Sequence, residues 1–217
     1  MSFFGYSKSH QEYFVKNGQK VVYGYKRYIV TSTDNDQWVY FLKKGLIRVS
    51  YTLLDGKERL IGYFVPGVTF AKSGTFFDSP DGTLEYTTGE ESVLYRLPRD
   101  KFLSELKNNE ELSSDYMNMV LRNQIFLIDR VVYQGENGIH RKLLRWLLFM
   151  AKYYGSINNG SAEIIFFLSQ EEIANFLHVT RVSVNNTLSF YTKKGVITTK
   201  DRKIYIPSLD RIKELLE

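Results

Sequence analysis

The apolar positions of the first hundred residues recur in short β-rich runs. Turn residues such as Asp-Gly and Pro-Gly separate these runs at intervals of roughly 8–12 residues, a spacing typical of an antiparallel sandwich or barrel. The predicted strands are 21–23, 28–30, 38–42, 46–51, 59–64, 84–87 and 92–97. Residues 1–18 show no clear periodicity. The pattern predicts a β-barrel of the jelly-roll kind over residues 1–108.

After Pro98 the apolar spacing becomes that of helices. Residues 99–107 predict a short helix and 109–134 a long one of about seven turns. Two rows with alternating spacings of three and four run along the long helix. The first row is Leu112, Tyr116, Met119, Asn123, Phe126, Arg130 and Tyr133, and the second is Met117, Val120, Gln124, Leu127 and Val131. Two rows indicate two packing partners, the barrel and the same helix of a second chain, although one broad core-facing stripe fits the periodicity equally well.

Two glycines in residues 135–138 mark a candidate hinge at the end of the long helix. We therefore assign 109–136 to a dimerisation helix with its hinge and 137–217 to a separate domain. In that domain, residues 139–154 predict a helix, 155–161 a loop and 163–167 a strand.

Two short helices with a sharp turn between them are predicted from residue 168 onward. Ser169 and Glu172 form a capping box at the first helix, and Thr180 caps the second. The inward-facing residues are Ile173, Ala174, Leu177, Val184 and Leu188. The runs 196–199 and 203–206 read as a β-hairpin wing. This is the pattern of a winged helix-turn-helix, whose second helix lies in the DNA major groove; a plain helical hairpin is the alternative.

The charge distribution supports a polyanionic partner for this last domain. The chain has 29 Lys and Arg against 24 Asp and Glu. Residues 137–217 hold 12 of the former and 7 of the latter, which leaves 17 against 17 for residues 1–136. All of the excess positive charge therefore accompanies the helix-turn-helix.

Several classes of chemistry are excluded by composition. The chain has no cysteine, so disulfides, thiolate metal sites and iron–sulfur clusters are excluded. The histidines are His10, His140 and His178, and none falls in the predicted barrel strands. Haem and metal binding are therefore not expected, and no cofactor is assigned. Neither a signal peptide nor a membrane-spanning run is apparent, which indicates a cytoplasmic protein.

The order of barrel, long helix, hinge and winged helix-turn-helix gives an α+β chain that resembles the Crp–Fnr family of bacterial transcription regulators. The best local matches are residues 40–45, 54–58, 64–67 and 168–206. The resemblance implies a cyclic-nucleotide-binding-like barrel that takes a small effector and a long helix that pairs with its twin. It also implies a dimer that reads near-palindromic double-stranded DNA, with RNA polymerase as a partner.

The residues that bind cyclic AMP in that family are not matched here. Lys72 stands where the ribose glutamate is expected, and Gly82 and Thr83 replace the Arg-Ser pair for the phosphate. Leu127 and Ile128 replace the hydroxyls that meet the purine. The resemblance therefore implies an effector other than cyclic AMP.

Aromatic residues and one lysine dominate the equivalent pocket, and no arginine lies between Arg59 and Arg96 to hold a phosphate bidentately. An anionic, partly apolar molecule would fit, as do the halogenated phenolic acids that some family members bind. Core packing of the aromatic rings is the alternative. The candidate pocket residues are Phe70, Lys72, Thr83, Tyr86, Asn123 and Leu127.

By resemblance, Arg181, Val182 and Asn186 occupy base-reading positions. Arg181 can donate to guanine O6 and N7, Asn186 can pair with adenine, and Val182 can touch a thymine methyl. Other short polar residues suit phosphates, and the basic wing residues add non-specific attraction. The predicted DNA contacts are Ser169, Gln170, Thr180, Arg181, Val182, Ser183, Asn185, Asn186, Arg202 and Lys203.

Two rival functions remain open at this point. A constitutive DNA-binding regulator with a ligand-free barrel has the same helix-turn-helix. A β-barrel enzyme with an accessory helical domain needs a nucleophile with its base, or a metal cluster. It is the weaker rival, because the barrel strands have neither histidine nor cysteine.

Overall fold

A computed structural model of the chain describes residues 8–30, 37–71, 82–164, 168–200 and 203–217. These residues form two compact units. The first holds the described residues up to Leu121, and the second is Arg122–Glu217. Helix α3 (Glu110–Gln134) runs through the boundary and contributes a half to each unit.

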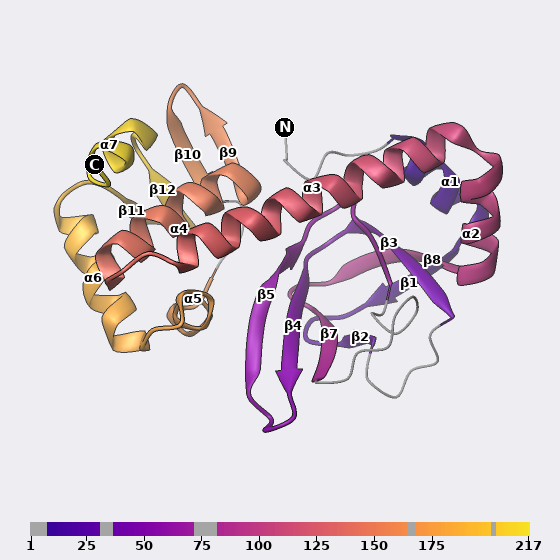
Figure 1. Ribbon diagram of the computed structural model, residues 1–217, viewed down its shortest axis with the longest axis horizontal. Coiled ribbons are helices and arrows are strands. Elements are labelled where there is room, and N and C mark those ends of the chain that lie inside the picture. The colour runs from indigo at the N-terminus through magenta and orange to yellow at the C-terminus, as the bar shows by residue number, and fades with distance from the viewer. Residues whose placement is uncertain (1–7, 31–36, 72–81, 165–167, 201–202) are drawn as a thin grey trace. The chain divides into compact units, whose positions relative to one another are not determined.

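The first unit is built on two antiparallel four-stranded sheets, ordered β1-β8-β3-β6 and β2-β7-β4-β5 (Figure 1). The strands are β1 (Gln19–Tyr23), β2 (Tyr28–Val30), β3 (Trp38–Lys44), β4 (Ile47–Leu53), β5 (Glu58–Phe64), β6 (Thr69–Ala71), β7 (Gly82–Thr88) and β8 (Ser92–Pro98). Chain neighbours are often separated in the sheets, as in a jelly roll, so the predicted fold class is confirmed. Strand β6 was not predicted.

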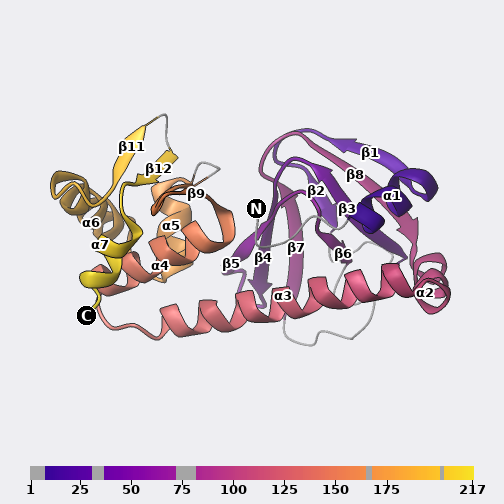
Figure 2. The ribbon, with the colours of Figure 1, turned by 90° about the horizontal axis from the view of Figure 1, so that it is seen from above.

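Strand β3 shows why this unit has two cores. Its residues 39–42 are buried without interruption, because both faces of the strand are covered. Tyr40 and Leu42 point into the barrel. Val39 and Phe41 point outward against Phe14 of α1 (Lys8–Asn17) and a residue of α2 (Arg99–Asn108). Figure 2 shows α1 beside strands β8 and β3. Burying one such ring contributes roughly 1.5–3 kcal/mol, so the helices are part of the domain's stability.

The turn between β3 and β4 depends on a glycine. Gly45 has φ +106°, and a Cβ there would lie 2.2 Å from the Ser92 hydroxyl oxygen. The same hydroxyl accepts a hydrogen bond from the Leu46 amide at 3.3 Å. A side chain at position 45 would therefore both strain the backbone and displace a contact between two strands.

Residues 1–18 show no periodicity in the sequence, but Lys8–Asn17 form helix α1. A histidine holds this helix in place. Only His10 and Phe14 are buried on this helix, too few for a periodic signal. The His10 ring donates from Nε2 to the Leu112 carbonyl at 2.9 Å, and its Nδ1 lies 3.2 Å from the Thr69 hydroxyl. The ring also stacks on Tyr116. One imidazole therefore joins α1, strand β6 and the start of α3.

This histidine makes stability depend on pH. Burial lowers the pKa of His10 below its usual value, against the opposing effects of the Leu112 carbonyl and the Asp115 charge. The unfolded chain thus takes up the proton first, at a pKa of about 6.5. Stability is complete above that pH and is lost as the pH falls toward the lower folded-state pKa. We expect the free energy of unfolding to fall less between pH 7.5 and 5.5 in His10→Gln than in the wild type, as measured by urea denaturation. Identical pH dependence in both proteins would contradict the assignment.

The second unit combines the C-terminal half of α3 with a helical domain and one sheet. Its elements are α4 (Ile139–Tyr154), β9 (Gly155–Asn158), β10 (Ser161–Ile164), α5 (Gln170–Leu177), α6 (Arg181–Lys193), β11 (Thr198–Lys200), β12 (Lys203–Ile206) and α7 (Leu209–Glu214). The sheet order β11-β12-β10-β9 joins the wing hairpin to a second hairpin. Helix α4 forms the centre, with nine buried residues that include Trp146 and Tyr153.

Two predictions in this unit were wrong. Residues 155–161 are not a plain loop, because β9 pairs with β10 around a turn at Asn159 and Gly160, both with positive φ. The pairing of β10 with β12 stabilises this hairpin, and that partner lies some forty residues away in sequence. The strand expected at 163–167 begins earlier and is described only to Ile164; residues 165–167 lie outside the described residues. Helix α7 was not predicted.

None of the helices in the described part of the chain is both long and apolar enough to cross a membrane.

Candidate nucleic-acid interface

Helix α5 begins at the predicted capping box. The Ser169 hydroxyl accepts from the Glu172 amide at 3.1 Å, and the Ser169 amide donates to the Glu172 carboxylate at 2.9 Å. These two bonds satisfy donors that the first turn leaves unpaired. The start of α5, including Gln170, is therefore held rigidly.

Helix α6 is capped by Thr180, whose hydroxyl accepts from the Ser183 amide at 3.2 Å. The two hydroxyls also lie 2.9 Å apart. Val184 and Leu188 are buried as predicted, which fixes the rotation of the helix about its axis. The cap and these two contacts determine which side of α6 faces outward.

The turn between α5 and α6 adopts a left-handed conformation at His178, with φ 54° and ψ 48°. Histidine tolerates that region better than most residues with a side chain. The amide of Val179 then donates to the Ala174 carbonyl at 3.1 Å, and Ala174 is buried where the helices meet. The crossing of the two helices is thus closed by a small residue and a tight turn.

The outer side of α6 carries polar and basic side chains. Arg181, Asn185 and Asn186 are exposed, and Val182 is 68% exposed. Gln170 of α5 reaches this side and donates from Nε2 to the Asn185 Oδ1 at 2.8 Å. The structure therefore brings Gln170, a predicted phosphate contact, to Asn185, on the side of α6 that also carries the predicted base-reading residues.

The wing offers less positive charge to a DNA backbone than the sequence predicted. Lys203 donates to the Glu163 carboxylate at 2.9 Å, so part of its charge is used within the sheet. Lys200 is exposed at the end of β11. Arg202 lies outside the described residues.

The C-terminal half of α3 packs directly on the helix-turn-helix. The Arg130 guanidinium lies 4.5 Å from the centre of the Phe176 ring, and Phe176 is buried in α5. Gln134 meets the turn residue His178, with their side-chain nitrogens 3.2 Å apart. The sequence placed Arg130 in the first row of the long helix but did not indicate these partners. This half of α3 is therefore joined to the helix-turn-helix by direct side-chain contacts.

Aromatic rings and ion pairs hold α3 against α4. Phe126 lies 5.0 Å from the rings of both Phe149 and Tyr153, measured between centroids. Asp129 accepts from Lys152 at 2.6 Å. At the predicted hinge, the Glu136 carboxylate accepts from two arginines of α4 at 3.0 and 2.9 Å. The segment after α3 is thus tied to α4 by charge as well as by packing.

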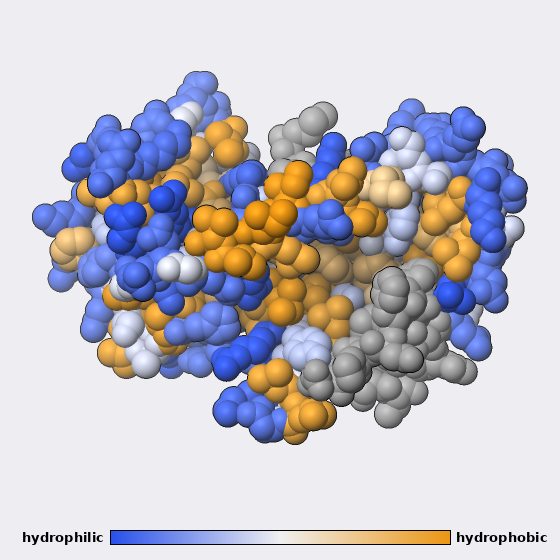
Figure 3. All heavy atoms as spheres, viewed as in Figure 1, coloured by the Kyte–Doolittle hydropathy of each residue, from blue (hydrophilic) through white to orange (hydrophobic). Residues whose placement is uncertain are grey.

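The opposite side of α3 is apolar and exposed. Figure 3 shows an apolar band along this helix. Its residues, between 45% and 64% exposed, are Met117, Leu121, Ile125, Ile128 and Val132. We call this set the exposed row.

The first row predicted from sequence is largely buried. Leu112, Met119, Phe126 and Tyr133 are all under 10% exposed. The second predicted row is less uniform than the exposed row, since Val120 is half-buried and Gln124 is polar. The exposed row itself was missed, although its spacings of four and three residues were a readable signal.

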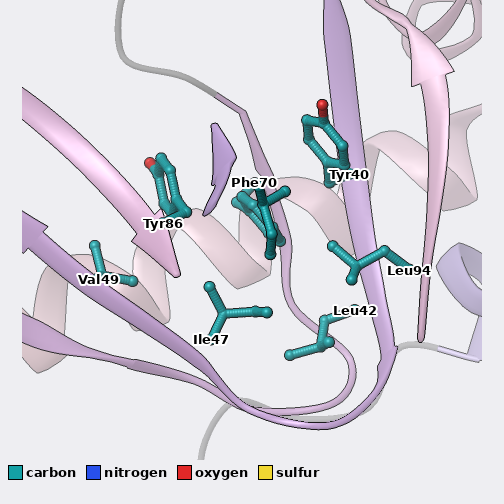
Figure 4. Close-up of a cluster of buried hydrophobic side chains, with 8 residues drawn as sticks. Tyr40, Leu42, Ile47, Val49, Phe70, Tyr86 and Leu94 are labelled. Carbon is teal, nitrogen blue, oxygen red and sulfur yellow. The ribbon is translucent and has the colours of Figure 1, made fainter. Parts of the chain in front are cut away.

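The interior of the barrel is filled by stacked aromatic rings. Phe70 lies between Tyr40 and Tyr86 (Figure 4). The ring centroids are 5.4 and 5.0 Å apart, respectively. The Tyr86 hydroxyl donates to the Ala71 carbonyl at 3.0 Å, and burial raises its pKa well above the usual value. Two of the predicted pocket residues are therefore members of the barrel core.

The other predicted pocket residues are Lys72, Thr83, Asn123 and Leu127. Lys72 lies outside the described residues. Thr83 is described as part of β7, where it pairs with Thr52. Leu127 is 47% exposed on α3, and both it and Asn123 belong to the second unit.

The three histidines contribute to packing and to local backbone structure. His10 is a core residue of the first unit, and His178 shapes the helix-turn-helix turn. His140 lies at the start of α4, with its Nδ1 3.3 Å from the Tyr191 hydroxyl. Among the described residues, no group of three histidines or carboxylates could hold a metal ion.

Comparison with protein families assigns both units. Residues 20–109 match the cyclic nucleotide-binding domain, and residues 141–215 match the Crp-like helix-turn-helix domain.

Curated relatives are regulators that match most of the chain. A CRP-like cAMP-activated global transcriptional regulator of Mycobacterium tuberculosis is 22% identical over 174 residues, which cover 80% of this chain and 77% of that protein. A lactate racemization regulatory protein of Lactiplantibacillus plantarum is 27% identical over 177 residues, 79% of each chain.

Solved structures share the fold over nearly the whole length. A variant of CooA from Carboxydothermus hydrogenoformans aligns with a TM-score of 0.80 at 17% identity and covers 100% of both chains. A CprK variant complexed with OCPA aligns with a TM-score of 0.76 at 18% identity, covering 99% of this chain and 95% of that one. With a cyclic nucleotide-binding domain followed by a Crp-like helix-turn-helix domain, this chain belongs to the Crp–Fnr family of DNA-binding transcription regulators, not to a family of enzymes.

Proposed function

We propose that this protein is a homodimeric, sequence-specific DNA-binding regulator whose barrel takes a small effector other than cyclic AMP. The outer side of α6 carries the proposal. Arg181, Asn185 and Asn186 are exposed there, while the inner side and the cap hold the helix rigid. Side chains with several donors on a fixed helix suit the edges of bases in the major groove.

The exposed row supports the dimer. Five apolar side chains at spacings of four and three residues form the seam expected of two paired helices. The opposite side of the same helix packs on α5 through Phe176. Pairing of α3 with its twin would therefore fix the two recognition helices relative to each other, as reading half-sites about 34 Å apart requires.

The effector proposal rests on the residues that stand where the family binds a cyclic nucleotide. Gly82 and Thr83 offer no guanidinium for a cyclic phosphate, and the interior around Phe70 is aromatic and buried. The ligand of CprK named in its structure, OCPA, is one analogue for the class of molecule. An aromatic anion matches this environment better than a nucleotide does.

A constitutive regulator is the second candidate, and the same rings favour it. Phe70 and Tyr86 already satisfy each other by stacking, so the barrel is stable without a ligand. DNA affinity measured with and without a metabolite extract separates the two candidates.

We further propose that the regulator acts in the cytoplasm, with RNA polymerase as a second partner. Both proposals come from the family, whose curated members are transcription regulators.

Selection of bound sequences from random DNA tests the proposed function. We expect a near-palindromic consensus with two half-sites one helical turn apart, and sedimentation at micromolar concentration should show a dimer. Selected sequences without twofold symmetry, or a monomer that binds as tightly, would reject the dimeric regulator.

Arg181→Ala is expected to weaken binding to the selected operator by about 1–3 kcal/mol, because one base contact in each half-site is lost. Melting temperature should not change, since the side chain is exposed. Arg211→Ala, which removes an exposed arginine of α7 paired with Glu214, is the matched control and should leave affinity unchanged. Equal affinities of the two variants would show that Arg181 reads no base.

A further inference from the structure

We propose that Gln170 is a positioning residue that fixes the orientation of the Asn185 amide, so that Asn185 presents a hydrogen-bond donor to the DNA. This inference rests on the proposed function. It adds a base preference for one position of each half-site and a second role for a residue otherwise expected to contact only phosphate.

The two residues lie on separate rigid elements. Gln170 is the first residue of α5, directly after the Ser169 capping box, and Asn185 lies in the second turn of α6. The Gln170 Nε2 donates to the Asn185 Oδ1 at 2.8 Å. Because both backbones are fixed, this bond constrains the side chain of Asn185 and not the loop between the helices.

The direction of the bond decides what Asn185 offers to a base. An amide accepts at its oxygen and donates at its nitrogen. Because Oδ1 accepts from Gln170 and Asn185 is exposed, its Nδ2 group is the part of the amide that can donate to a base. In the major groove, guanine O6 and N7, adenine N7 and thymine O4 are acceptors, whereas cytosine presents only its N4 donor. The base opposite Asn185 is therefore expected to be guanine, thymine or adenine, each of which offers an acceptor, and cytosine is disfavoured.

Phosphate contact by Gln170 is compatible with the same arrangement. A phosphate oxygen only accepts, so it requires a donor from Gln170. The Gln170 amide nitrogen carries two hydrogens, of which one goes to Asn185 and the other remains for the phosphate. Binding to the DNA backbone therefore maintains the orientation that the free protein already has.

Two substitutions of Gln170 test the direction of the bond. In Gln170→Glu the side chain can only accept, so the Asn185 amide should turn over and present its oxygen outward. An outward oxygen needs a base amino group, so cytosine should gain and guanine and thymine should lose, by roughly tenfold or more in relative affinity at that position. In Gln170→Lys the side chain still donates, so the wild-type preference should be retained.

The measurement is selection from DNA libraries randomised at one position at a time, for the wild type, both Gln170 variants and Asn185→Ala. Asn185→Ala identifies the position, because discrimination should disappear there alone. A uniform loss of affinity in Gln170→Glu, with the base preference unchanged, would overturn the positioning role. So would an Asn185→Ala protein that keeps the wild-type preference at every position. Failure of the wild type to select any symmetric site would instead reject the proposed function, so the two failures are distinguishable.

Discussion

Ile128→Asp is expected to convert the dimer into a monomer and to weaken operator binding by roughly 10²–10⁴-fold, the usual gain from joining two binding modules. Ile128 is 62% exposed and lies in the exposed row between Ile125 and Val132. An aspartate there places two like charges in an apolar seam, where neither is solvated. Because the side chain is exposed within one chain, the monomer should keep its fold. Sedimentation and titration of a labelled operator measure the two effects.

Leu127→Asp is the matched control. Leu127 is also apolar and about half exposed, but it lies beside the exposed row, in the second row predicted from sequence. We expect this variant to remain a dimer. If Leu127→Asp is a monomer and Ile128→Asp is a dimer, the two helices pair through the second predicted row, which includes Val131, and not through the exposed row.

Phe126→Ala is expected to lower the free energy of unfolding of the second unit by about 3–5 kcal/mol, the usual cost of removing a buried phenyl ring. The ring is 7% exposed and contacts three rings of α4. Its loss should also free the C-terminal half of α3 from the DNA-binding domain and so reduce operator affinity.

The two tryptophans allow this loss to be measured in one unit. Trp146 lies in α4 and Trp38 in the barrel. In a Trp38→Phe background, urea unfolding followed by fluorescence reports on the second unit alone. Gln124→Ala, an exposed change on the same helix, should shift stability by less than about 0.5 kcal/mol. A Phe126→Ala protein as stable as this control would show that the ring cluster does not hold α3.

The helix-turn-helix could be predicted in detail because its determinants are local. The capping box at Ser169 and the cap at Thr180 each depend on residues within four positions in sequence. The barrel was predicted as a class for a similar reason, since turn chemistry and strand propensity are local.

What could not be predicted depends on distant partners. The short helix α1 is fixed by His10, whose two partners are 59 and 102 residues away. The hairpin β9–β10 needs β12 to complete its sheet. The link between Gln170 and Asn185 needs a known crossing of two helices, which residue spacing does not give.

The stacked interior of the barrel has a kinetic consequence. Phe70 contacts Tyr40, Phe64 and Tyr86, so a molecule that binds among them must first displace a ring. Opening of the stack then precedes capture of the ligand, and the observed association rate should level off at the opening rate as ligand concentration rises. In a regulator of this kind, the delay of the response is set by the opening rate of the ring stack. It is not set by how fast the effector is supplied.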